Sequence, residues 1–152
     1  MQTIDELIAQ ASVFTGLDPR HLELIAGCAA NEHVEEGAEL LREGKPAERF
    51  YLIRHGTVAV EVHAPGRGAL TIETLHAGDA VGLSWLFEPY RWQLDARALE
   101  PCALIGFDAV CLRGKLETNH ELGYELMRRF TANLVERLQA TRLQLIDVYG
   151  RA

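Results

Sequence analysis

Hydrophobic residues in this chain recur with a helical period at both ends and with a period of two in between. Near the start, residues 3–6 have the spacing of a capping box, and Asp18-Pro19 is typical of a second helix start. The pattern predicts helices within residues 1–30, a β-sheet region over 33–108 and further helices over 109–148. We therefore expect a single α+β domain that is mainly β.

The central region reads as short strands separated by turns that contain glycine. The clearest pair is 50–54 and 57–62, which are joined through His55-Gly56, and the runs 70–75 and 103–107 complete the set. Residues 63–68, HAPGRG, are typical of a hairpin tip. Several short strands at this spacing predict a closed or rolled antiparallel sheet.

A long amphipathic helix is predicted over residues 119–148, with a second capping box at 118–121. Thirty residues correspond to about 45 Å of helix. The helix carries a near-heptad apolar seam: Met127, Phe130, Leu134, Leu138, Thr141, Leu145 and Val148. Two interpretations stay open, because the seam can pack against the chain's own sheet or against a partner helix.

The stretch from Gly78 to Ala98 combines a turn, a short helix and a strand. Gly78-Asp79 is typical of a tight turn, and the apolar run 83–87 is long enough for one or two helical turns. Free amides at the start of that run form a potential anion site. From Trp92 onwards the residues alternate again, which predicts a half-buried strand up to Ala98. Together these elements can enclose a small pocket.

This stretch resembles the phosphate-binding cassette of the cyclic-nucleotide-binding domain in the catabolite-activator (Crp/Fnr-like) family of bacterial regulators. The resemblance extends upstream to three further motifs in the family's order: Phe14-x-Gly16-Leu17, Gly37-x-x-Leu40-x-x-x-Gly44 and Phe50-Tyr51-Leu52-Ile53-x-x-Gly56-x-Val58-x-Val60. It implies one domain over residues 1–152, built as a β-roll of the double-stranded β-helix or jelly-roll type. It also implies N-terminal helices and a C-terminal helix that forms a homodimer through 119–148.

Two positions depart from the family's cassette. Leu83 stands where the family has a glutamate that binds the ribose hydroxyl, and Trp92 stands where it has the phosphate-binding arginine. Neither replacement can make the bidentate or carboxylate contacts of a cyclic nucleotide. Arg91 lies one place earlier, and it is either a displaced anion ligand or a surface arginine. Binding of cyclic AMP itself is therefore disfavoured.

The resemblance nevertheless marks a set of candidate ligand-binding residues. Ser84 can donate a hydroxyl to an anion or cap the short helix. Trp85 and Trp92 can stack on a flat ligand or belong to the core, and the second interpretation is favoured for large aromatics in a small roll. The complete candidate set is Gly82, Leu83, Ser84, Trp85, Arg91 and Trp92.

Composition excludes several classes of function. The net charge of −7 disfavours a nucleic-acid partner. Apolar runs are too short for a membrane span, and the six histidines lack metal-ligand spacing. No nucleophile or acid–base motif indicates an enzyme. The cysteines at 28, 102 and 111 are interpreted as small buried hydrophobes in a reducing, cytoplasmic compartment.

Two functional hypotheses remain. The first is a non-enzymatic sensor or regulatory module that binds a cyclic nucleotide or other small anion and signals through its dimer helix. The second is a dimeric protein-interaction scaffold that binds no ligand. Family regulators continue beyond this helix into a DNA-binding domain, whereas this chain ends at Ala152. Two interpretations follow: a stand-alone module, or part of a longer regulator whose remaining part determines the output. For this chain we expect contact with neither nucleic acid nor membrane.

Overall fold

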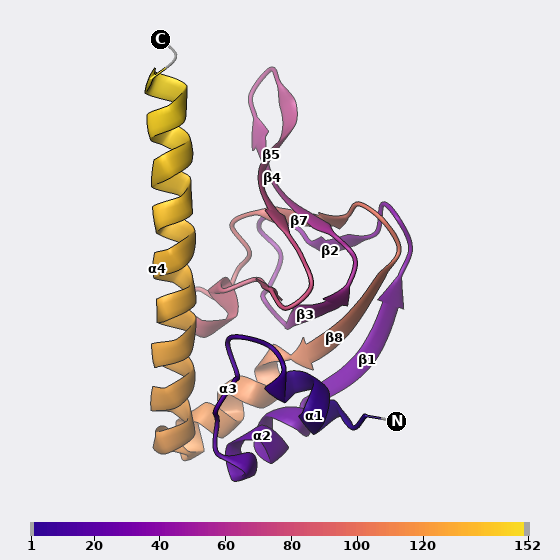
Figure 1. The fold of residues 1–152 in the computed structure, drawn as a ribbon, viewed down its shortest axis with the longest axis vertical. Coiled ribbons are helices and arrows are strands. Elements are labelled where there is room, and N and C mark those ends of the chain that lie inside the picture. The colour runs from indigo at the N-terminus through magenta and orange to yellow at the C-terminus, as the bar shows by residue number, and fades with distance from the viewer. Residues whose placement is uncertain (1, 151–152) are drawn as a thin grey trace.

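The computed structural model describes residues 2–150 and consists of a β-roll with helices at its base and along one side (Figure 1). Helix α1 spans Ile4–Ala9 and α2 spans Pro19–Ala26. The capping box at the start of α1 is confirmed, because the Thr3 hydroxyl accepts from Glu6 N at 3.2 Å and the Glu6 carboxylate accepts from Thr3 N at 3.0 Å. At α2 the Asp18 carboxylate accepts from Arg20 N. Arg20 also holds the pKa of Asp18 down, at about 2.

The roll is made of two four-stranded antiparallel sheets. One sheet has the order β1-β8-β3-β6 and the other β2-β7-β4-β5. Their bounds are β1 Ala29–Val34, β2 Glu39–Leu41, β3 Arg49–His55, β4 Val58–Ala64, β5 Gly68–Leu75, β6 Ala80–Val81, β7 Asp95–Ala98 and β8 Cys102–Asp108. The predicted fold class, a mainly β roll of rolled antiparallel sheets with flanking helices, is confirmed. The first strand begins at Ala29, inside the range predicted as helical.

An aromatic cluster joins the roll to the C-terminal helix. The Phe50 ring stacks on Trp85 with centroids 4.3 Å apart and on Phe107 at 4.6 Å. Phe130 meets Trp85 edge-on at 5.6 Å. Each such pair adds about 0.5–1.5 kcal/mol to the free energy gained by burying the rings. This cluster fixes where the helix leaves the domain.

Two helices follow the roll, α3 over Ala109–Thr118 and α4 over His120–Gly150. The cap of α4 differs from the predicted box: Asn119 accepts from Leu122 N at 3.1 Å, while the Thr118 hydroxyl bonds back to α3. Leu122, Leu126 and Phe130 are buried against the domain, whereas residues 138–150 are all exposed. The first half of α4 therefore packs on its own domain, and the exposed second half rises at the height of the β4–β5 hairpin (Figure 1).

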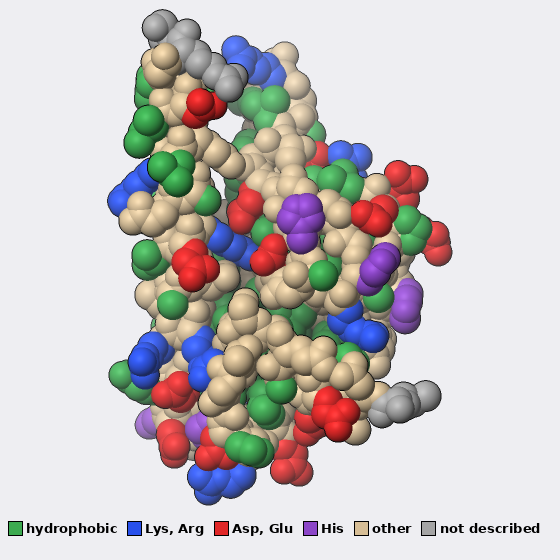
Figure 2. Space-filling view, viewed as in Figure 1, with side chains coloured by type: hydrophobic (Ala, Val, Ile, Leu, Met, Phe, Trp, Pro, Cys, Tyr) green, Lys and Arg blue, Asp and Glu red, His purple; other side chains and the backbone are tan. Residues whose placement is uncertain are grey.

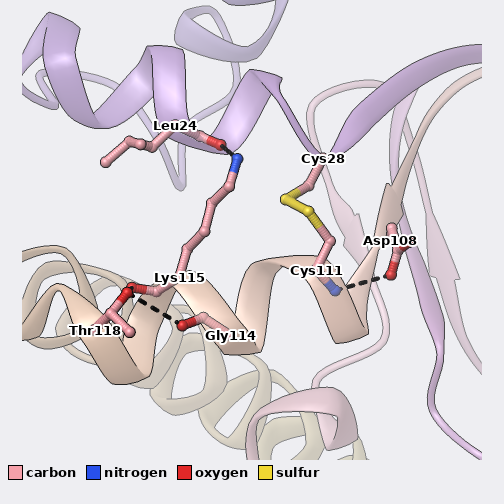
Figure 3. The surroundings of a disulfide bond; sticks show 7 residues. All are labelled: Leu24, Cys28, Asp108, Cys111, Gly114, Lys115 and Thr118. Carbon is pink, nitrogen blue, oxygen red and sulfur yellow. Dashed lines mark hydrogen bonds between the residues drawn. A yellow bond between two sulfur atoms is a disulfide. The ribbon is translucent and has the colours of Figure 1, made fainter.

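A disulfide joins Cys28 to Cys111, with the two Cα atoms 5.9 Å apart (Figure 3). The prediction of unpaired cysteines is wrong for these two. The pairing of β1 with β8 brings them together, since Asp108 N donates to Cys28 O at 2.8 Å and α3 begins at once. Cys102 is free and 3% exposed, as expected of a small hydrophobe, and burial raises the pKa of its thiol.

Candidate ligand pocket

A pocket of about 290 Å³ lies between the roll, the cassette stretch and α4. The surface is hollowed between the distal half of α4 and the β4–β5 hairpin (Figure 2). Strands β2, β4, β5 and β6, the segment 82–84, the segment 92–94 and α4 all contribute to the lining. The lining residues are Leu41, Val60, Glu73, Val81, Gly82, Leu83, Ser84, Trp92, Gln93, Leu94, Leu134 and Arg137.

Gly82 lets the chain turn directly beneath an aromatic ring. Its φ of +99° lies in the region that side chains avoid. A Cβ there would stand 2.7 Å from ring carbons of Trp92 and 3.3 Å from Leu41 Cδ1. Two features therefore require glycine at this position: the positive φ and the close approach of the Trp92 ring.

Trp92 is 6% exposed, and backbone bonds hold it from two sides. Gly44 N donates to Trp92 O at 2.8 Å, and Trp92 N donates to Lys45 O at 3.0 Å. The regular strand β7 begins only at Asp95, so the predicted strand from Trp92 is shorter than expected. Trp92 forms one wall of the pocket and leaves the 290 Å³ open.

The structure separates the remaining candidates. Leu83 and Ser84 line the pocket at the start of a 3-10 turn over Ser84–Leu86. Trp85 is fully buried in the aromatic cluster and is absent from the lining. Arg91 is exposed in an adjoining recess and donates to Gly44 O at 2.9 Å. The pocket therefore unites Gly82, Leu83, Ser84 and Trp92, and it leaves out Trp85 and Arg91.

An arginine that sequence reasoning missed projects into the pocket from α4. The side chain of Arg137 is only 18% exposed, its Nη2 donates to Ala80 O, and its Nε lies 3.5 Å from Glu73 Oε1. The signal in the sequence was its place three residues after Leu134 and seven after Phe130, on the stripe that begins in the core. Among the described lining residues, Arg137 is the single basic side chain and Glu73 the single acidic one.

A second arginine, Arg113 on α3, holds the 3-10 turn of the cassette in place by hydrogen bonds. Arg113 Nη1 on α3 donates to Ala47 O and to Trp85 O, each at 2.9 Å. Its guanidinium also lies over the Tyr90 ring, 4.4 Å from the centroid. Because α3 carries the disulfide as well, the short turn of the cassette is tied to the helical base of the domain.

Other kinds of site are not found in the part of the chain that the structure describes. Residues 2–150 contain no group of three metal-ligating side chains. Within the same residues, no helix is long and apolar enough to cross a membrane.

The model of the family described as "Cyclic nucleotide-binding domain" matches residues 31–119. The chain is 24% identical over 145 residues to the CRP-like cAMP-activated global transcriptional regulator of Mycobacterium tuberculosis, covering 95% of this chain and 63% of that one. It is 29% identical over 113 residues to the anaerobic regulatory protein of Bacillus subtilis, covering 74% and 48%. The chain thus spans about half to two thirds of the length of these relatives.

Among solved structures, a cyclic nucleotide-binding domain from Methylobacillus flagellatus has the same fold. The TM-score is 0.79 at 20% identity, covering 95% of this chain and 81% of that one. At this identity the likeness concerns the fold.

Proposed function

The chain belongs to the family of cyclic nucleotide-binding domains, whose model matches residues 31–119, and we propose on this premise that it is a non-enzymatic sensor module for a small anionic or nucleotide-like ligand. The observation that carries the proposal is the pocket of about 290 Å³, which the cassette and α4 line together. Pockets of about this size that combine apolar walls with few polar groups are typical of small-molecule sites. The relatives' role as regulators supports the same class of function.

The tryptophans do not close the pocket. Trp85 is in the core, and Trp92 forms a wall, so the retained cavity favours a ligand over an empty scaffold. The walls argue against cyclic AMP as the ligand. Leu83 offers no carboxylate to ribose hydroxyls, and Trp92 offers no guanidinium to a cyclic phosphate.

The output of the sensor, in this proposal, is the position of α4. Leu134 and Arg137 belong to the pocket lining and also to the helix that leaves the domain. A ligand that contacts both can shift the helix only by binding one of its positions more tightly than another. The exposed distal half of α4 carries Leu138, Leu145 and Val148, which are 46%, 53% and 65% exposed. Pairing of two copies along this face would cover them and pass the shift to a partner.

The alternative function is a dimeric interaction scaffold without a ligand. The observation in its favour is the replacement of both cyclic-nucleotide contacts by Leu83 and Trp92. The two functions differ in a single property, which is saturable binding in the pocket.

The test fills the pocket with a larger side chain introduced on α4. Isothermal titration would measure binding of cyclic AMP, cyclic GMP and 1-naphthyl phosphate to the wild type, to Leu134→Trp and to Leu143→Trp. Leu134 lines the pocket, whereas Leu143 lies on the same helix, is 67% exposed and does not belong to the lining. We expect at least one probe to bind the wild type and Leu143→Trp with one site per chain, and Leu134→Trp to lose that binding at least tenfold. Absence of binding by all three probes would favour the scaffold instead.

A further inference from the structure

Arg137 is the last described residue of α4 whose side chain is partly buried. Its side chain is 18% exposed, whereas every described residue of α4 from 138 to 150 is exposed. The hydrogen bond to Ala80 O reaches the short strand β6, and the ion pair to Glu73 reaches β5. The residue therefore belongs to the pocket and to the junction between the buried and the exposed half of the helix.

The guanidinium keeps donors for another acceptor. Arginine has five N–H donors, and the hydrogen bond of Arg137 uses one on Nη2, while Nε forms an ion pair with Glu73 Oε1 at 3.5 Å. The acceptor of the hydrogen bond from Nη2 is the backbone oxygen of Ala80. This neutral acceptor orients the guanidinium without neutralising its charge. Glu73 is the neutralising partner, at 3.5 Å and with 34% of its own side chain exposed. An entering anion can take the place of Glu73, because the carboxylate is free to turn into solvent.

The other lining residues indicate the polarity of the part of the ligand that does not carry the anion. Around the charged pair the walls are mostly apolar: Leu41, Val60, Val81, Leu83, Trp92, Leu94 and Leu134. Such walls favour an apolar body, since burying polar groups against them without partners costs free energy. The guanidinium favours a carboxylate or phosphate, which it can bind through two parallel hydrogen bonds.

We propose that Arg137 is the anion-binding residue of the pocket, and that the ligand is a small molecule with one carboxylate or phosphate group on an apolar body. The ligand's anion replaces Glu73 on the guanidinium, while the bond to Ala80 O remains. This inference rests on the proposed sensor function and adds the ligand class and the residue that reads it. It also assigns Arg91 no part in binding, because that side chain is exposed and donates to Gly44 O outside the lining.

The experiment uses probes that share one apolar body. Naphthalene-1-acetate and 1-naphthyl phosphate carry the two candidate anions, and naphthalene-1-acetamide is their neutral counterpart; cyclic AMP is a fourth probe. Each is titrated into the whole 152-residue chain and into Arg137→Gln, Arg91→Gln and Glu73→Gln. Circular dichroism melts of each variant control for folding.

We expect at least one anionic probe to bind the wild type ten times more tightly than the amide. Arg137→Gln should remove that advantage and leave binding of the amide unchanged, and Arg91→Gln should change neither by more than about twofold. Glu73→Gln should tighten binding of the anion severalfold, because it removes the competing carboxylate. A gain of affinity cannot come from a misfolded variant, so this arm is independent of stability.

Three results would overturn the inference. Equal binding of acid and amide would show that the pocket does not read charge. Loss of anion binding in Arg91→Gln but not in Arg137→Gln would assign the anion to the other arginine. Binding of cyclic AMP alone would keep the sensor function and reject the ligand class, whereas no binding of any probe would reject both.

Discussion

Gly82 and Trp92 show how closely the pocket is built at the scale of single residues. Carbons of the indole ring lie 2.7 Å from the position that a Cβ on residue 82 would take, which is closer than van der Waals contact, and the backbone there has a φ of +99°. Replacing the family's arginine by tryptophan is therefore more than the loss of a charge. The ring uses space that Gly82 leaves and so becomes part of the wall.

Substitution of Gly82 by alanine should destabilise the protein more than the same change at Gly66. Both glycines have positive φ, +99° and +76°, but nothing lies within 4 Å of a Cβ on Gly66. We expect Gly82→Ala to lose about 1–3 kcal/mol more unfolding free energy than Gly66→Ala, because it adds overpacking to the backbone strain. Urea denaturation of both variants measures the difference, and equal losses would contradict the close contact.

The sequence indicated four residues of the pocket and missed the charged pair. One local motif, the stretch from Gly78 to Ala98, contains all four of them: Gly82, Leu83, Ser84 and Trp92. The local pattern was therefore sufficient to place them. Arg137 and Glu73 are 64 positions apart and meet because α4 docks beside β5. That docking depends on the packing of Phe130, which no local pattern specifies. Of the two interpretations of Arg91, displaced anion ligand or surface arginine, the exposed side chain and its bond to Gly44 O favour the second.

At the scale of elements, helix α3 holds the cassette and the base of the domain together. Arg113 Nη1 donates to Trp85 O. Lys115 Nζ donates to Leu24 O at 2.7 Å, and Cys111 is bonded to Cys28 (Figure 3). The periodicity of hydrophobic residues predicted β3, β4, β5, β8 and the long helix, whereas β1 begins inside the range predicted as helical. The periodicity gave no information on the disulfide, because partners 83 residues apart are brought together by the pairing of β1 with β8.

Breaking the disulfide should lower the stability of the fold. A cross-link that closes a loop of this length typically contributes about 2–4 kcal/mol, largely through the unfolded chain. We expect dithiothreitol to lower the melting temperature of the wild type and to leave that of Cys28→Ser/Cys111→Ser unchanged. Cys102→Ser serves as the control and should respond to the reductant as the wild type does, since Cys102 is free. A wild type that is indifferent to reductant would show that the bond contributes nothing.

At the scale of the whole molecule, α4 presents an apolar face that its own domain does not cover. Residues 138–150 are exposed, and they include Leu138, Leu145, Ile146 and Val148. The first half of the helix is buried at Leu122, Leu126 and Phe130. Of the two interpretations that the sequence left open, packing on the chain's own domain applies to the first half of the helix. For the second half we propose a partner copy.

Charge on this face should separate two copies. We expect Leu138→Asp to raise the dimer dissociation constant at least 100-fold, because it buries an unpaired carboxylate in the proposed interface. Gln139→Asp adds the same charge one residue away, outside the seam, and should leave the dimer intact. Sedimentation equilibrium of the three proteins measures the constants. A wild type that is monomeric at every concentration would contradict the assignment of the second half.

For the molecule as a whole, we propose that the pocket binds a ligand and that α4 responds to it. Hydrogen–deuterium exchange along the chain, with and without saturating 1-naphthyl phosphate and separately cyclic AMP, tests both parts at once. We predict that at least one probe slows exchange in segments 80–84 and 130–138, which line the pocket or flank its lining, while the hairpin tip 63–68 stays unchanged. Exchange that neither probe alters in the pocket segments would contradict the account.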